Sequence, residues 1–410
     1  MPDPLKDKKI VFGVCGGIAA YKAVDLLRVL VKAGAEVRVI MTRAAQAFVG
    51  PVTFEALSGH SVWTQMFGEQ GDKPFRHIAW AAEADAVVIV PATANIIGKM
   101  SHGIADDPLT TFILAVRAPI LVCPSMNIHM YENHLVQENI KRLEQTGIKV
   151  LRPETGLLAC GHEGPGRLPD VETIAEEVRS LLCPKDLAGE RIVVTAGPTQ
   201  EPIDPVRFIS NPSSGKMGHV LARVAQRRGA EVSLVTGPTV LPDPQGVKVI
   251  QVRTAEEMFN AVMDTAEKAT IIVMAAAVSD WRPASLFEHK VKKEEMAQDL
   301  RLEETVDILK ALGENKNRQI LVGFAAETRD LQENACAKLA AKNLDLIVAN
   351  LIGQADSGFG SDTNQVSLFY RDGRNEALPL MDKGALADIL FDKVLEIRKK
   401  TDDGTDSNLQ

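Results

Sequence analysis

The sequence repeats one local pattern: a short apolar run, a glycine-containing turn and then an amphipathic segment. The first copy is the run 9–15 followed by Gly16 and Gly17, and the second is the run 191–196, whose long loop ends at Gly215. A buried strand, a glycine turn and a helix are typical of parallel, doubly wound sheets, where ligands bind at the carboxyl ends of the strands. The chain is therefore expected to contain two nucleotide-sized sites.

The length of the chain favours two domains. At 410 residues it is too long for one ordinary core, and an apolar content of 45% is enough for two. Apolar runs alternate with helical segments in both halves, which predicts an α/β fold of two doubly wound, Rossmann-like three-layer domains. We predict a first domain over 1–190 with a linker at about 183–190, a second over 191–400, and a disordered tail over 401–410.

Charge and cysteine content exclude several classes of protein. The net charge is −8 and no long basic run is present, which argues against nucleic acid or an anionic membrane as a partner. No apolar stretch is long enough to span a bilayer, and the first residues lack the apolar core of a signal peptide. The five cysteines include no CxxC pair, which indicates reduced thiols and a cytoplasmic protein.

The first glycine turn disfavours NAD. Its sequence, GVCGGIA, is not G-x-G-x-x-G, and the second strand ends in Thr42 and Arg43 where an NAD site has an acidic residue for the ribose. Thr42 and Arg43 suit a phosphate, either that of FMN or the additional one of NADP. A turn whose glycines serve only to pack the helix on the strand is an equally open interpretation of this stretch.

Five further motifs of the first half, taken together, resemble those of a known protein family. They are His77 with Ile78, PATAN (91–95), GIADD (103–107), PSMNIHM (124–130) and LACGHEGPGRL (158–168). In this order and at these distances they resemble the flavin-dependent cysteine decarboxylases, and within that family the phosphopantothenoylcysteine decarboxylases.

The resemblance implies a mechanism in which FMN oxidises the substrate thiol to a thioaldehyde, which accepts the electrons left by CO2, and then reduces the enethiol. It also implies His77 as the base, Asn127 as the group that holds the substrate carboxylate, and Cys160, on a flap, as the proton donor of the final reduction. Taken singly, each of these residues is more often structural. The implied FMN contacts are Gly16, Gly17, Thr42, Thr93, Asn95 and Met126.

The second half contains residues suited to a nucleotide. Asp280 follows an apolar strand, and Lys290, Lys292 and Lys293 lie together shortly after it. Lysines near a strand-end acid can neutralise a triphosphate, while Asp280 could hold Mg²⁺ or the nucleotide. A solvated surface cluster is the ordinary alternative. Since GxxxxGK[ST] is missing, the site is not a P-loop.

The segments TAGPTQEPIDPVRFISNPSSGKMG, AAVSDW, KVKK and GFAAET together resemble phosphopantothenate–cysteine ligase, and the order of the two halves matches the fused bacterial enzyme. The resemblance implies that CTP activates the phosphopantothenate carboxylate as an acyl-cytidylate, from which the amine of cysteine displaces CMP. It implies that Asn211 binds the acyl-cytidylate, that Lys290 stabilises charge during its formation, and that Ser213–Lys216 lies near a dimer interface. The implied CTP-binding residues are Asp280, Lys290, Asp307, Ile308, Phe324, Lys338 and Lys342.

Together these features predict a bifunctional coenzyme A biosynthesis enzyme. The resemblance also implies trimers of the flavin domain and dimers of the ligase domain, hence a dodecamer, with Mg²⁺ bound through the CTP phosphates. Two other classes stay open: an NADP- or flavin-dependent oxidoreductase with Arg43 at the cofactor, and a non-catalytic flavin-binding regulatory protein. The presence of His77, Asn127 and Cys160 together favours an enzyme. The choice between CTP and ATP is open as well.

Overall fold

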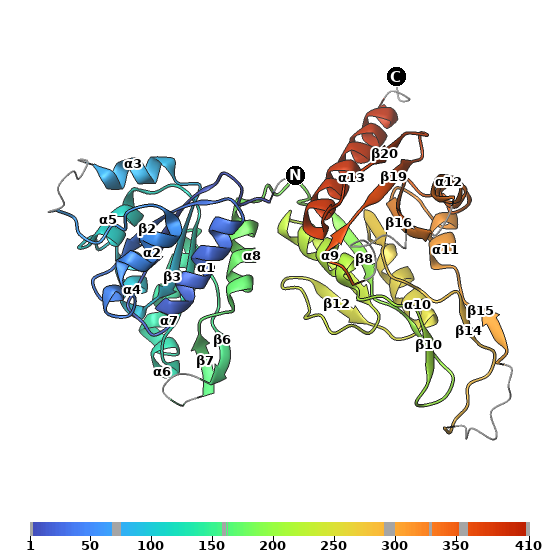
Figure 1. Cartoon of the computed structure of the whole chain (residues 1–410), viewed down its shortest axis with the longest axis horizontal. Helices are drawn as coiled ribbons and strands as arrows, with labels where there is room; N and C mark the ends of the chain where they lie inside the picture. The colour runs from blue at the N-terminus through green and yellow to red at the C-terminus, as the bar shows by residue number, and fades with distance from the viewer. Residues whose placement is uncertain are drawn as a thin grey trace. The chain divides into compact units, whose positions relative to one another are not determined.

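The computed structural model describes residues 3–67, 75–157, 161, 163–290, 300–327, 330–351 and 360–406. The chain forms two compact units, Pro2–Cys183 and Pro184–Gln410 (Figure 1). Segment 184–190, predicted to be part of a linker in the first domain, therefore belongs to the second unit. Its Leu187 is fully buried in that unit's core.

The first unit is built on a parallel sheet with the order β2-β1-β3-β4-β5. The order runs outward from β1 in both directions, so the switch point of the winding lies between β1 and β3. β3 is buried along its whole length, as expected for a strand covered on both faces. The strands are β1 (Lys9–Val14), β2 (Glu36–Met41), β3 (Ala86–Ala92), β4 (Ile120–Pro124) and β5 (Lys149–Val150).

Helices cover both faces of this sheet. On one face, α1 (Ala20–Lys32), α2 (Pro51–Ser58) and α8 (Val171–Leu182) share a core with the strands. α1 contributes Ala23, Leu26, Leu27 and Leu30, a spacing that places apolar side chains on one side of a helix. The other core is formed with α3 (Arg76–Glu83), α4 (Ala94–His102), α5 (Pro108–Ala115) and α7 (His134–Gln145).

The second unit contains a larger sheet, with the order β12-β11-β8-β13-β16-β17-β19-β20. The strands from β12 to β17 are parallel, and β19 and β20 are antiparallel. Its switch point lies between β8 and β13. The strands are β8 (Arg191–Ala196), β11 (Glu231–Thr236), β12 (Lys248–Gln251), β13 (Ile271–Met274), β16 (Ile320–Glu327), β17 (Leu346–Leu351), β19 (Val366–Tyr370) and β20 (Asn375–Ala377).

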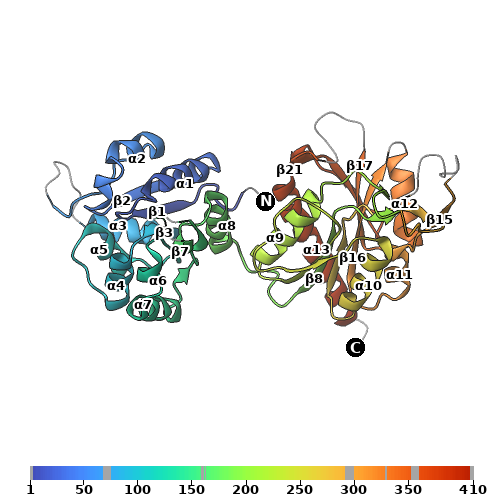
Figure 2. The same cartoon turned by 90° about the horizontal axis from the view of Figure 1, so that it is seen from below.

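Helices again form the outer layers. α9 (Lys216–Arg227) and α13 (Lys383–Asp406) pack on one face, and α10 (Ala255–Ala266), α11 (Ile308–Glu314) and α12 (Leu331–Ala341) pack on the other (Figures 1 and 2). The prediction of two doubly wound α/β domains is confirmed. α13 runs to Asp406 and so includes 401–406, while the disorder predicted for 401–410 stays a prediction. Extending a helix that is already packed costs little, because the nucleation penalty has been met.

Four short antiparallel strand pairs lie outside the two large sheets, and the first three of them are hairpins. They are β6 (Glu154–Leu157) with β7 (Glu163–Arg167), β9 (Gln200–Pro202) with β10 (Phe208–Ser210), β14 (Trp281–Pro283) with β15 (Leu302–Glu304), and β18 (Thr363–Asn364) with β21 (Met381–Asp382). Their strands are too short to show a period of two. Within the described ranges, no helix is long and apolar enough to cross a membrane.

Candidate active sites

The first candidate site lies at the carboxyl edge of the five-stranded sheet. Gly16 follows β1, and a Cβ there would lie 2.5 Å from the Cβ of Ala44, so close packing requires glycine at this position. Gly17 has no atom within 4 Å of its ideal Cβ position, which leaves open space before α1. The Thr42 N–H donates to the Val14 carbonyl at 3.0 Å, so the ends of β1 and β2 meet here.

The PATAN and GIADD motifs shape the middle of this edge. The Thr93 hydroxyl caps α4, which begins at Ala94 and includes Asn95, by accepting from the Ile96 N–H at 3.4 Å. Asp107 caps α5 by accepting from the Thr110 N–H at 2.8 Å. Cys15 lies between these elements. Burial raises the pKa of its thiol to about 12, although a hydrogen bond with the backbone of Thr93 opposes the change.

Asn127 lies where three motifs meet. Its Oδ1 caps α6 (Ile128–Tyr131) by accepting from the His129 N–H at 2.9 Å. The Ser125 N–H donates to the Ala92 carbonyl of PATAN at 2.9 Å, and the Met126 N–H donates to the Gly166 carbonyl of hairpin β6–β7 at 3.1 Å. The structure therefore brings the predicted residues Thr93, Met126 and Asn127 to one edge of the sheet.

His77 is placed differently. It lies in the first turn of α3, where the guanidinium of Arg76 stacks on Trp63 at 5.7 Å and on Trp80 at 5.9 Å from the ring centroids. Figure 1 shows α3 and hairpin β6–β7 at opposite ends of this unit, so one chain does not bring His77 together with Asn127. Cys160 lies outside the described residues.

The second candidate site is a cavity of about 520 Å³ at the carboxyl edge of the larger sheet. It lies where β13 and β16 end and where α9 and α11 begin. All but one of the residues predicted for ligation line it, namely Asn211, Asp280, Asp307, Ile308, Phe324, Lys338 and Lys342.

The loop after β8 forms one wall of the cavity. The Asn211 side-chain amide donates to the carbonyls of Ala277 at 3.3 Å and Val278 at 2.9 Å, which holds this loop against the end of β13. A Cβ on Gly218 would lie 2.5 Å from the Cβ of Ala196, so α9 packs directly on β8. Gly215 caps α9 without a side-chain hydrogen bond, and the first turn of α9 lines the cavity. The Lys216 N–H donates to the Ser214 hydroxyl at 3.4 Å, and backbone N–H groups at a helix start favour an anion.

The opposite wall contains an ion pair. The Lys342 Nζ lies 2.9 Å from Asp307 Oδ2, and Asp307 caps α11 by accepting from the Lys310 N–H at 3.0 Å. Burial acts to raise the pKa of Asp307, but the hydrogen bonds from Lys342 and the Lys310 backbone outweigh it and hold the pKa below its ordinary value.

Sequence reasoning did not identify Lys216 and Lys383 as residues of this cavity. Both line the cavity, and the position of Ser213–Lys216 near a dimer interface stays a prediction. Lys216 pairs with Asp362 at 2.8 Å. Lys383, which is 5% exposed, donates to the Ser361 carbonyl, and burial together with the charge of Lys216 lowers the pKa of Lys383. No motif marks Lys383, because the last helix brings it to the cavity from a distant part of the chain.

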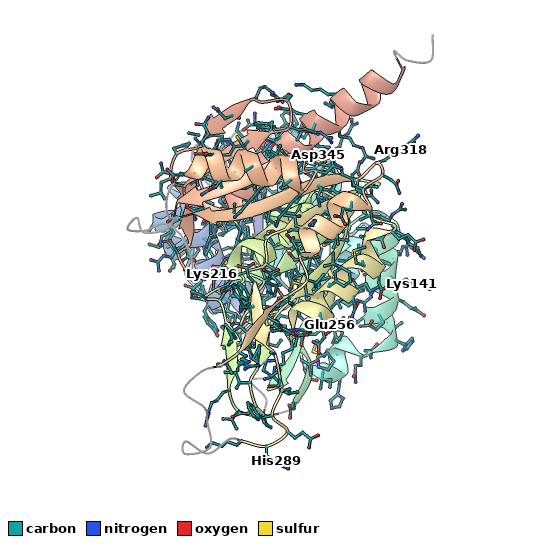
Figure 3. The ribbon with its side chains drawn as sticks, turned by 90° about the vertical axis from the view of Figure 1, so that its right-hand side faces the viewer. Lys141, Lys216, Glu256, His289, Arg318 and Asp345 are labelled. Carbon is teal, nitrogen blue, oxygen red and sulfur yellow. The ribbon has the colours of Figure 1, made fainter. Side chains whose placement is uncertain are left out.

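Lys290 is not among the residues that line the cavity. It lies between β14 and β15, and Figure 3 shows its neighbour His289 at the far end of an extended loop. The structure therefore does not bring Lys290 together with Asn211. Lys292 and Lys293 lie outside the described residues.

Comparisons with known proteins agree with the division of the chain into two units. The family described as "Flavoprotein" matches residues 1–183, and "DNA/pantothenate metabolism flavoprotein C-terminal domain" matches 187–397. The Coenzyme A biosynthesis bifunctional protein CoaBC of Bacillus subtilis is 47% identical over 97% of this chain and 99% of its own length. The protein of the same name from Escherichia coli K12 is 43% identical over 95% of this chain and 97% of its own.

Among solved structures, the C-terminal domain of a Coenzyme A biosynthesis bifunctional protein CoaBC is 42% identical, with a TM-score of 0.45, over 52% of this chain and 97% of that one. Both family matches and the near-complete coverage of the relatives lead to one conclusion. The chain belongs to the family of the bifunctional coenzyme A biosynthesis proteins CoaBC.

Proposed function

We propose that the second unit joins phosphopantothenate to cysteine at the expense of CTP, and that the first unit decarboxylates the product, phosphopantothenoylcysteine, to phosphopantetheine. The main support is the cavity of the second unit, because residues predicted for ligation from five separate sequence segments line one space. Family membership supports the pairing of the two activities, since the product of one is the substrate of the other.

In the ligase cavity, a carboxylate must first be activated, because it is a poor electrophile at neutral pH. Asn211, held by the carbonyls of Ala277 and Val278, is suited to orient the acyl-cytidylate. Lys338 and Lys342 line the cavity and would neutralise the phosphates of CTP, with Mg²⁺ bound through those phosphates. For Lys290 to contribute, its loop has to move toward the cavity.

The first unit fits FMN. The open space at Gly17 and the start of α1 suit the phosphate, with Thr42 beside them. Bound FMN would supply the oxidation of the substrate thiol and the later reduction of the enethiol. The remaining proposed contacts are Thr93, Asn95 and Met126, at the ends of β3 and β4.

The protein's own residues then hold the substrate and move protons. Asn127 would hold the carboxylate with a neutral amide, which suits a group about to leave as CO2. His77 would act as the base, and because α3 lies far from Asn127 in one chain, it would act in the site of a second copy. Cys160 stays the predicted proton donor.

Such a shared site agrees with the proposed trimer of the first unit. Exposed apolar side chains on the hairpins of the second unit, namely Val206, Phe208, Leu286 and Phe287, support its proposed dimer. Together the two contacts would produce a dodecamer. Cytoplasmic location stays a prediction, supported by the role of the family in coenzyme A synthesis.

The test is to incubate the protein with phosphopantothenate, cysteine, Mg²⁺ and either CTP or ATP, and to follow products by mass spectrometry. Phosphopantetheine formed with CTP supports both halves and the nucleotide. Accumulated phosphopantothenoylcysteine would count against the roles of His77, Asn127 and Cys160. Decarboxylation of added phosphopantothenoylcysteine without any ligation would count against the ligase assignment.

A further inference from the structure

The hairpin β6–β7 carries an irregularity at Gly166. Glu154 pairs with Arg167 and Thr155 pairs with Pro165, so Gly166 is an extra residue on β7. An extra residue of this kind is a β-bulge. Its backbone groups are not paired with the neighbouring strand, so they are available to another segment. Here the Gly166 carbonyl accepts the hydrogen bond of the Met126 N–H, on the turn that leads from β4 to α6.

The contact at Gly166 leaves no room for a side chain. Gly166 is buried, its φ is +146°, and a Cβ would lie 2.3 Å from the carbonyl oxygen of Met126. The other buried glycine of β7, Gly164, approaches Ile128 in the same way, with a Cβ position 2.2 Å from Ile128 Cδ1. The hairpin thus contacts the residues on both sides of Asn127.

Asn127 cannot readily adjust to a displaced neighbour. Its Oδ1 accepts a hydrogen bond from the His129 N–H, and its backbone carbonyl accepts one from the Tyr131 N–H at 2.9 Å. On the other side, Ser125 is hydrogen-bonded to Ala92 of β3. Any shift of the Met126 carbonyl therefore rotates a peptide that includes the nitrogen of Asn127.

We propose that Gly166 is a positioning residue for decarboxylation, whose carbonyl and lack of a side chain set the backbone of Met126 and hence the direction of the Asn127 amide. The inference rests on the proposed function of Asn127 in holding the substrate carboxylate. A methyl group at Gly166 requires a displacement of roughly 1 Å to reach ordinary contact with the Met126 oxygen. A misplacement of that size costs about 10- to 100-fold in rate.

The experiment compares Gly166→Ala, Gly156→Ala and Asn127→Ala in the full chain. Gly156 lies in the partner strand β6, where a Cβ meets only Arg167 at an ordinary 3.7 Å, so it is the matched control. Decarboxylation of added phosphopantothenoylcysteine is measured as kcat and KM. Flavin absorbance and ligation by the same chain report whether each unit stays folded.

We expect kcat/KM of Gly166→Ala to fall about 10- to 100-fold with a raised KM, while flavin content and ligation persist and Gly156→Ala stays within about twofold of the unaltered chain. A raised KM is the signature of a misdirected carboxylate contact, because loss of folded molecules lowers kcat alone. Unchanged kinetics, an unchanged KM or lost flavin in Gly166→Ala each overturn the inference. If Asn127→Ala decarboxylates normally, the proposed function of Asn127 fails instead.

Discussion

Asp307 and Lys342 illustrate how one contact in the ligase cavity sets the charge of a carboxyl group. Replacing Lys342 with Met removes the hydrogen bond that opposes burial, so the pKa of Asp307 should rise, and the KM for CTP should rise about tenfold. Carboxyl ¹³C titration and steady-state ligation measure the two effects. Lys310→Met is the control, because its backbone N–H still donates to Asp307 and only a weaker charge interaction is lost, so the pKa of Asp307 should rise less than in Lys342→Met. An unchanged Asp307 titration would contradict this account.

The same pair predicts a pH dependence of stability. A lowered pKa in the folded state means that the Asp307 carboxylate stabilises the fold above the ordinary aspartate pKa of about 3.9. That contribution is lost as pH falls through the lower pKa of the folded state.

The described cysteines should differ sharply in reactivity. Burial raises the pKa of Cys15 to about 12 and raises the pKa of Cys123 further, so both thiols stay protonated at pH 8, whereas Cys336 is exposed on α12. Brief treatment with iodoacetamide should label Cys336 and leave Cys15 and Cys123 unmodified until the chain is denatured. Peptide mass spectrometry measures each site. Early labelling of Cys15 would show that the first sheet opens on the time scale of the reaction.

At the scale of elements, glycine matters most where a helix lies directly on a strand. Gly218→Ala forces a methyl group against Thr195 and Ala196, so it should destabilise the second unit by about 1–3 kcal/mol and weaken ligation. Gly98→Ala, inside α4, meets only Asn139 at 3.7 Å and should stabilise the first unit by about 0.5–1 kcal/mol. Urea unfolding with separate readouts for the two activities measures both. Equal effects of the two substitutions would refute the proposed packing.

For the whole molecule, the proposed shared site predicts complementation between copies. His77→Asn and Asn127→Ala should each abolish decarboxylation and leave ligation unchanged, since both residues lie in the first unit. Mixed assemblies of the two variants should recover roughly a quarter of the decarboxylation activity, because random assembly leaves that share of interfaces with both native residues. Co-expression followed by light scattering and product analysis measures this. Mixed assemblies without any recovered activity would place His77 and Asn127 in the same copy.

Sequence reasoning reached the fold and two residues of the ligase cavity for a physical reason, and the family resemblance supplied the other predicted residues. Buried parallel strands must be apolar, and ligand groups gather at their carboxyl ends, so Asp280 and Phe324 could be assigned to one edge from local patterns. It did not predict hairpins such as β6–β7, whose few residues show no period and whose pairing depends on contacts with other elements.

By itself, then, the sequence determined what short-range chemistry decides: the alternating elements, the two glycine turns and the family motifs. Only the tertiary structure decided which distant residues meet. It brought Lys383 to the ligase cavity, placed Lys290 outside it, and separated His77 from Asn127 within one chain. These placements depend on the packing of whole helices and hairpins, which no local pattern in the chain encodes.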